Sequence, residues 1–83
     1  MNPVIVNEIN KRFFEALDMV VASRMIRGVA TFCNEHNIDR RNLIKTQKSP
    51  TEQRVKTEWI YFLATDFNIS ADWIITGRGG MFK

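Results

Sequence analysis

Apolar side chains recur every three or four residues along most of this 83-residue sequence, and that spacing constrains the fold more than any other feature. One such stripe would run along a helix at about residues 7–21, with Asn7 as its N-cap, and comprises Ile9, Phe13, Leu17 and Val20. No segment shows the strict alternation, bounded by Asn-Gly or Asp-Gly pairs, that is typical of a β-hairpin. The spacing therefore predicts an all-α chain, and its length allows one small domain.

Residues that start or stop helices divide the middle of the chain. We expect a second helix at residues 28–36, ended by Asn37, because Asn enters the left-handed conformation more readily than most other residues with a side chain. Asp39 is a strong N-cap candidate for a third helix, which would reach about residue 47. Two short helices joined by a tight turn are therefore predicted.

A loop and a longer helix are predicted next. Pro50 disfavours helical geometry at Ser49, so we expect a loop at residues 48–52. A fourth helix would start at residue 51 or 52 and continue to residue 67, because apolar residues again recur at helical spacing. Asn68 would stop it.

Small and polar residues predict a fifth, short helix near the C-terminus. Ser70 would cap its start. Gly77 suits the residue after its C-cap, and Gly79 and Gly80 would then release the chain.

Charge is concentrated in one segment of the sequence. The chain has a net charge of +3, but residues 40–56 hold six basic residues and one acid, Glu52, for a net charge of +5. The remaining six basic and eight acidic residues give −2. The six basic residues of the segment are Arg40, Arg41, Lys45, Lys48, Arg54 and Lys56. A basic segment of this kind indicates either a polyanionic partner or a solvated helix face.

Three residues around the predicted tight turn have the spacing that two steeply crossing helices need. Cys33 is small enough to let the helices approach, Asn37 reverses the chain, and Leu43 pins the second helix onto the first. The third helix would then lie with its N-terminal residues outward. In helix-turn-helix proteins that end enters the DNA major groove.

This stretch resembles the lambda-repressor-like, or Xre-type, helix-turn-helix family. The segment FNISADWIITGRG at residues 67–79 is similar to the family's signature Val-Ser-x-x-Trp-Leu-x-x-Gly, and the two matches together span residues 7–80. The resemblance implies a compact five-helix DNA-binding domain, with the helix-turn-helix at its second and third helices, occupying residues 1–83. It also implies a small, stand-alone bacterial or phage transcription regulator that binds duplex DNA as a homodimer.

Carried over by position, the resemblance gives candidate contacts with DNA. Its recognition-helix face would comprise Arg40, Arg41, Ile44 and Lys45. The two arginines suit the O6 and N7 acceptors of guanine or flanking phosphates. Lys45 would also contact phosphates, as would Lys48, Arg54 and Lys56. Ile44 would either touch a thymine methyl group or pack beneath the helix.

The sequence departs from the family pattern at four positions. Val29 stands where many members have a Gln that contacts DNA, and Asn37 replaces the usual turn glycine. His36 occupies a normally aliphatic position and Cys33 a normally alanine position. Val29 and Ile44 keep an alternative open, in which the domain is an antitoxin-like or adapter module that binds protein and does not read DNA.

Other functional classes find no support in the sequence. The lone Cys33 excludes an intramolecular disulfide, and together with His36 it supplies too few ligands for a zinc site. No acid pair and no Ser-His-Asp grouping indicates catalysis, and no run of about 18 apolar residues indicates a membrane span. We therefore expect a cytoplasmic protein that is not an enzyme and has no cofactor, no metal and no evident small-molecule ligand.

Two questions stay open at this point. The chain would be either a minimal Cro-like regulator or the N-terminal part of a longer repressor. Its dimer surface would be the fifth helix with residues 81–82, and residues 4–6 are a candidate addition, because both tails are apolar.

Overall fold

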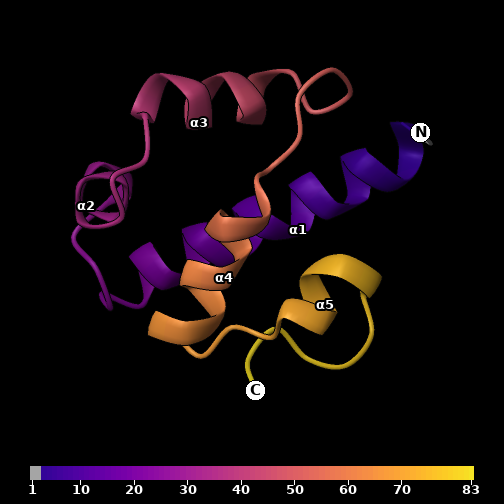
Figure 1. Ribbon diagram of the computed structural model, residues 1–83. Helices are drawn as coiled ribbons and strands as arrows, with labels where there is room; N and C mark the ends of the chain where they lie inside the picture. Colours follow the sequence, from indigo (N-terminus) through magenta and orange to yellow (C-terminus); the bar gives the residue numbers. More distant parts are fainter. Residues whose placement is uncertain (1–2) are drawn as a thin grey trace.

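Five helices are present in residues 3–83, the part of the chain that the computed structural model describes (Figure 1). They are α1 (Pro3–Ala22), α2 (Val29–Glu35), α3 (Arg40–Lys48), α4 (Thr57–Asp66) and α5 (Ala71–Thr76). The β pairing within these residues is one isolated antiparallel bridge between Ile69 and Phe82. The expected all-α class is therefore confirmed. None of the helices in residues 3–83 combines the length and the apolar character that a membrane span requires.

The longest helix, α1, provides the central packing surface. It packs against α3, α4 and α5, and Figure 1 shows it running through the middle of the molecule with α3 on one side and α5 on the other. The fully buried Phe13 lies 5.0 Å from Phe14 and 6.1 Å from Trp59 of α4, measured between ring centroids. Each large apolar side chain buried in this way stabilises the folded state by about 1.5–3 kcal/mol relative to an exposed one.

Two of the predicted N-caps, Asp39 and Ser70, and the three predicted stop residues act as expected. The carboxylate of Asp39 accepts a hydrogen bond from the backbone N–H of Arg41 (2.9 Å), and the hydroxyl of Ser70 accepts one from the backbone N–H of Trp73 (3.1 Å). The predicted stop residues have positive φ angles: Asn37 (54°), Asn68 (59°) and Gly77 (78°). The local signals in the sequence therefore set these helix boundaries.

The first helix starts earlier than the sequence predicts. α1 begins at Pro3, so Asn7 lies inside the helix and is not its N-cap. Proline is well suited to the first helical position, because the N–H groups of a first turn have no partner within the helix. The apolar residues at positions 4–6 then continue the helix.

The predicted start of the fourth helix is wrong. α4 begins at Thr57, and residues 49–56 form a turn followed by an extended segment, which we call the α3–α4 connection. The carbonyl oxygen of Ser49 accepts hydrogen bonds from the backbone N–H groups of Glu52 (3.1 Å) and Gln53 (2.9 Å). These bonds close one turn, after which the chain extends toward Thr57.

The buried side chain of Asn10, on α1, explains why the connection is not helical. Its Nδ2 donates to the carbonyl oxygens of Pro50 (3.0 Å) and Gln53 (2.7 Å), and its Oδ1 accepts from the backbone N–H of Val55 (2.9 Å). Asn10 is only 1% exposed. Its amide therefore takes up backbone groups that a helix over these residues would need for its own hydrogen bonds.

The C-terminal residues also differ from expectation. Gly79 and Gly80 do not release the chain, because Gly79 turns it back with φ 77°. The backbone N–H of Ser70 then donates to the carbonyl oxygen of Met81 (2.7 Å), and the Met81 side chain packs against the core. The tail is thus part of the folded domain.

The Asn10 contact can be tested by replacing Asn10 with Asp. Asp keeps the size and the acceptor but cannot donate to the two carbonyl oxygens, so we expect the free energy of unfolding at neutral pH to fall by about 3 kcal/mol. Urea unfolding followed by circular dichroism measures it. Asn7→Asp, one turn earlier on the same helix, is the control, and an equal loss in both variants would contradict the assignment.

Candidate nucleic-acid interface

Two buried residues set the orientation of α3. Leu43 and Thr46 are each 1% exposed and face the core, and α3 packs against α1. The buried Thr46 hydroxyl donates a hydrogen bond to the carbonyl oxygen of Asn42 (2.9 Å), so its polar group is satisfied within the core. The opposite face of α3 must therefore point toward solvent.

The outward face of α3 brings together four of the predicted contact residues. Arg41, Ile44, Lys45 and Lys48 line a shallow hollow of about 390 Å³, as expected for residues spaced three and four apart on one helix face. The three cations are exposed and Ile44 is half-buried. Within residues 3–83 none of these cations forms an ion pair, so their positive charge is not neutralised locally. We call these four residues the α3 outer face.

The other three predicted contact residues lie around this surface. Arg40 is exposed at the first position of α3, near Cys33, and does not line the hollow. Arg54 lies on the α3–α4 connection and lines a different groove. Lys56 occupies the N-cap position of α4 without a capping bond from its side chain, and its Nζ lies 6.0 Å from the centre of the Trp59 ring, within the range of a cation–π contact.

Cys33 lies in the core, in agreement with its interpretation as a small apolar residue. It is 1% exposed, and burial raises the pKa of its thiol above the ordinary value, although Arg40 partly offsets this effect. A protonated, buried thiol is a poor nucleophile and a poor metal ligand. No group of three or more His, Cys, Asp or Glu side chains in the part of the chain described is arranged to hold a metal ion.

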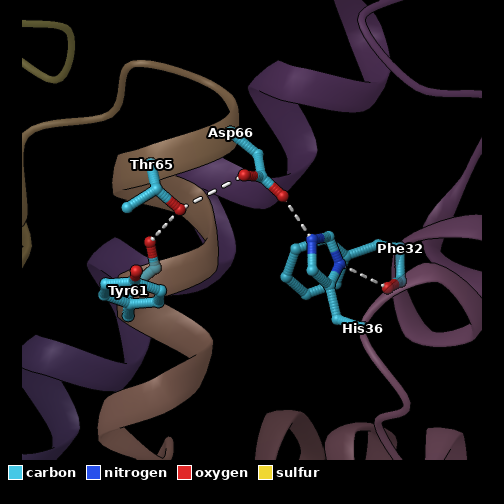
Figure 2. Close-up of polar contacts among 5 residues, drawn as sticks. All are labelled: Phe32, His36, Tyr61, Thr65 and Asp66. Carbon is cyan, nitrogen blue, oxygen red and sulfur yellow. Dashed lines mark hydrogen bonds and ion pairs between the residues drawn. The ribbon is translucent and has the colours of Figure 1, made fainter.

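His36 joins the turn before α3 to the end of α4. It is the C-cap of α2; its Nδ1 lies 2.8 Å from the carbonyl oxygen of Phe32 and its Nε2 lies 2.6 Å from Oδ2 of Asp66 (Figure 2). The ring also stacks on Phe62 with centroids 4.4 Å apart. Each ring nitrogen of His36 thus faces an oxygen atom, one on α2 and one on α4, so the ring bridges the two helices.

The contact with His36 changes the pKa of the Asp66 carboxyl group. The hydrogen bond from His36 lowers the pKa of Asp66 below the ordinary value, and a second hydrogen bond from the Thr65 hydroxyl (3.2 Å) acts in the same direction. Burial opposes the shift. A lowered pKa means that the contact stabilises the fold above the ordinary carboxyl pKa and that this stabilisation is lost as the pH falls through the lowered value.

Two residues that position the site are absent from the sequence-based predictions. Asn10 had a detectable signal, because it is polar yet lies three and seven residues before Phe13 and Leu17 on the apolar stripe of α1. A polar residue in such a stripe must find a partner when it is buried. Asp66 had no comparable signal, since its partner His36 lies 30 positions away in the sequence.

Replacing Asp66 with Asn should destabilise the domain at neutral pH, because Asn does not carry the charge that the His36 ring faces. The difference in melting temperature from the unmodified protein should be full above about pH 5 and should shrink as the pH falls below about 4, where ordinary carboxyl groups protonate. Thermal unfolding over this pH range measures it. Asp18→Asn removes an exposed carboxylate that has no polar contact in the described residues, and should show no such pH dependence. A difference for Asp66→Asn that is constant with pH would contradict this role.

Comparisons with protein families, with curated proteins and with solved structures gave no significant match. What the protein does is therefore inferred from its own geometry and charge. The features that bear on function are the α3 outer face, its support by Leu43 and Thr46, and the contact of Asn10 with the α3–α4 connection.

Proposed function

We propose that the protein binds duplex DNA by placing α3 in the major groove, and that it acts as a sequence-specific transcription regulator in the form of a homodimer. The observation that carries this proposal is the α3 outer face, where Arg41, Lys45 and Lys48 surround Ile44 on one exposed helix surface. The major groove of B-DNA is about 12 Å wide and admits one α-helix. A positively charged helix face of this size is therefore suited to it.

The chemistry of these side chains divides the expected contacts into two kinds. Arg41 lies near the start of α3, and its planar guanidinium can donate two hydrogen bonds to O6 and N7 of one guanine. Lys45 and Lys48 are flexible point charges that suit phosphate oxygens and carry no base preference. Arg40, beside the outer face, suits a flanking phosphate or a base edge.

The fold supports this proposal because the helix is held rigidly. Leu43 and Thr46 fix α3 on the core, and Asp39 fixes its first turn. Asn10 fixes the α3–α4 connection, which carries Arg54 and ends at Lys56. The basic residues after α3 thus keep a set position relative to those on it, as contacts with several phosphates of one duplex require.

A protein-interaction module that does not read DNA is the second candidate. Ile44 favours it, because this apolar residue lies among the charges of the α3 outer face and is half-exposed. Val29 carries less weight, because it packs against the core. Recovery of a partner protein by the purified chain, with loss of that partner in Ile44→Asp and no binding of DNA at low salt, would support this candidate.

Fluorescence anisotropy of labelled duplexes against salt concentration tests the DNA proposal. Binding should be measurable at about 50 mM salt, and Lys48→Ala should lower the slope of log affinity against log salt by about 0.9, as loss of one phosphate contact predicts. Arg78→Ala removes an exposed cation of the C-terminal segment and is the matched control. Affinity that does not depend on salt, or no binding at low salt, would contradict the proposal.

Selection from a random duplex library tests the sequence preference. We expect two-fold-related half-sites with centres about one helical turn apart. Arg41→Ala should weaken binding to the selected site by roughly 10- to 100-fold and relax the preference at one position of each half-site, because one good bidentate contact discriminates by about 1–3 kcal/mol. Lys45→Ala is the comparison variant and should weaken binding to all sequences about equally. A selected pool without any consensus would contradict sequence-specific binding.

A further inference from the structure

Ile44 is the apolar member of the α3 outer face, and it lies outside the core. Among the half-buried apolar side chains of residues 3–83, Val29 and Ile38 pack against the core cluster, whereas Ile44 does not. Leu43, the preceding residue, is 1% exposed and fills the core position at this point of α3. Packing beneath the helix, one of the two roles that the sequence leaves open for Ile44, is therefore taken by Leu43.

The residues that share the hollow with Ile44 are cations and one uncharged residue. Arg41 precedes Ile44 by three residues and Lys48 follows it by four, so both are its neighbours on the helix surface, and Lys45 is next to it in the sequence. Ser49, the C-cap of α3, completes the lining, and none of these described residues is acidic. An apolar group among cations alone suits a polyanion that presents a small apolar group between its charges.

Duplex DNA presents such an apolar group on its base edges in the major groove. It is the C5-methyl group of thymine, and a cytosine that is methylated at C5 carries a methyl group at the same place. The other groups that distinguish the base pairs there are hydrogen-bond donors and acceptors. Ile44 would leave such a polar group unpaired as water is expelled, which is unfavourable. Its side chain is therefore complementary to a pyrimidine that carries a C5-methyl group.

The spacing between Ile44 and Arg41 sets where this pyrimidine lies. Three residues of an α-helix rise by about 4.5 Å, and successive base pairs along a DNA strand are about 3.4 Å apart. A helix that lies along the groove thus places the methyl group about one or two base-pair steps from the guanine that Arg41 contacts in the proposed complex.

We infer that Ile44 recognises the C5-methyl group of a pyrimidine beside the guanine contacted by Arg41, so that the protein distinguishes methylated from unmethylated pyrimidines. This inference rests on the proposed function and names the base-edge chemistry that the α3 outer face selects. Thymine and 5-methylcytosine share this chemistry. Where the position holds thymine, the contact adds to the sequence preference; where it holds cytosine, methylation of the DNA raises the affinity.

Removal of single methyl groups from a bound duplex tests the inference with the unmodified protein. The probe is the duplex selected from the random library, in which each thymine is replaced in turn by uracil in both half-sites, because uracil lacks only the methyl group. At one position we expect the affinity to fall by about fourfold for each methyl group removed, as the loss of one buried carbon predicts. The slope of log affinity against log salt should stay constant, because no phosphate contact is lost.

A second pair of duplexes separates the two sources of the methyl group. At the position that the first series identifies, one duplex carries cytosine and the other 5-methylcytosine, and the methylated duplex should bind more tightly by the same factor of about four. An effect in the thymine and uracil pair assigns recognition to thymine, and an effect in the cytosine pair assigns it to 5-methylcytosine. The absence of a methyl effect in both pairs would overturn the inference.

A truncated side chain shows whether Ile44 causes the methyl effects. Ile44→Ala should abolish them while the duplex is still bound. Ile75→Ala is the matched control, because it truncates an isoleucine that is 50% exposed on α5, on the other side of α1 from α3 (Figure 1), and it should keep the effects in full. Methyl effects of equal size in Ile44→Ala and in the unmodified protein would contradict the assignment to this residue.

The same titrations distinguish a failure of this inference from a failure of the proposed function. Salt-dependent binding of the duplex without a methyl effect at any position contradicts only the role of Ile44. Failure to bind any duplex at low salt contradicts both. A protein partner that is lost in Ile44→Asp would then assign this side chain to a protein surface.

Discussion

The hydrogen bonds of one buried amide, that of Asn10, link the central helix to the basic segment of the chain. The amide donates twice and accepts once across 40 to 45 positions of sequence, so it ties α1 to the α3–α4 connection without any charge. Leaving these backbone groups unpaired in the interior would cost about 1–3 kcal/mol each. These hydrogen bonds therefore keep the chain after α3 extended, so that α4 begins only at Thr57. They also set the positions of Arg54 and Lys56.

The turn between α2 and α3 depends on a second set of contacts. Asn37 adopts the left-handed conformation, which costs a residue with a side chain about 1–2 kcal/mol. Packing on both sides offsets this cost, since Cys33 and Leu43 are buried, and His36 joins Phe32 to Asp66 and stacks on its aromatic neighbours. An aliphatic residue in place of His36 would supply packing but neither hydrogen bond. The turn is thus fixed by polar contacts as well as by the core.

How well the sequence predicted each element depended on how local its cause was. The five helices, the caps Asp39 and Ser70 and the stop residues Asn37, Asn68 and Gly77 follow from neighbouring residues, and each was predicted. The start of α4, the return of the C-terminal segment and the His36–Asp66 contact depend on partners distant in the sequence, and none was predicted. The same holds for the site. Of the four residues expected on one face of α3, Arg41, Ile44 and Lys45 line one hollow and Arg40 does not. The groove that Arg54 lines exists only after α1, α4 and α5 have packed. The resemblance to the lambda-repressor-like family stays a prediction.

The central claim is that α3 contacts duplex DNA with its outer face. Titration of the isotope-labelled protein with a duplex of about 20 base pairs, roughly two helical turns, tests it most directly by NMR. We predict that amide signals shift along α3 and the α3–α4 connection, foremost at Arg41, Lys45 and Lys48, while those of the returning C-terminal segment stay constant. Shifts confined to surfaces away from α3, or no shifts at low salt, would contradict the claim.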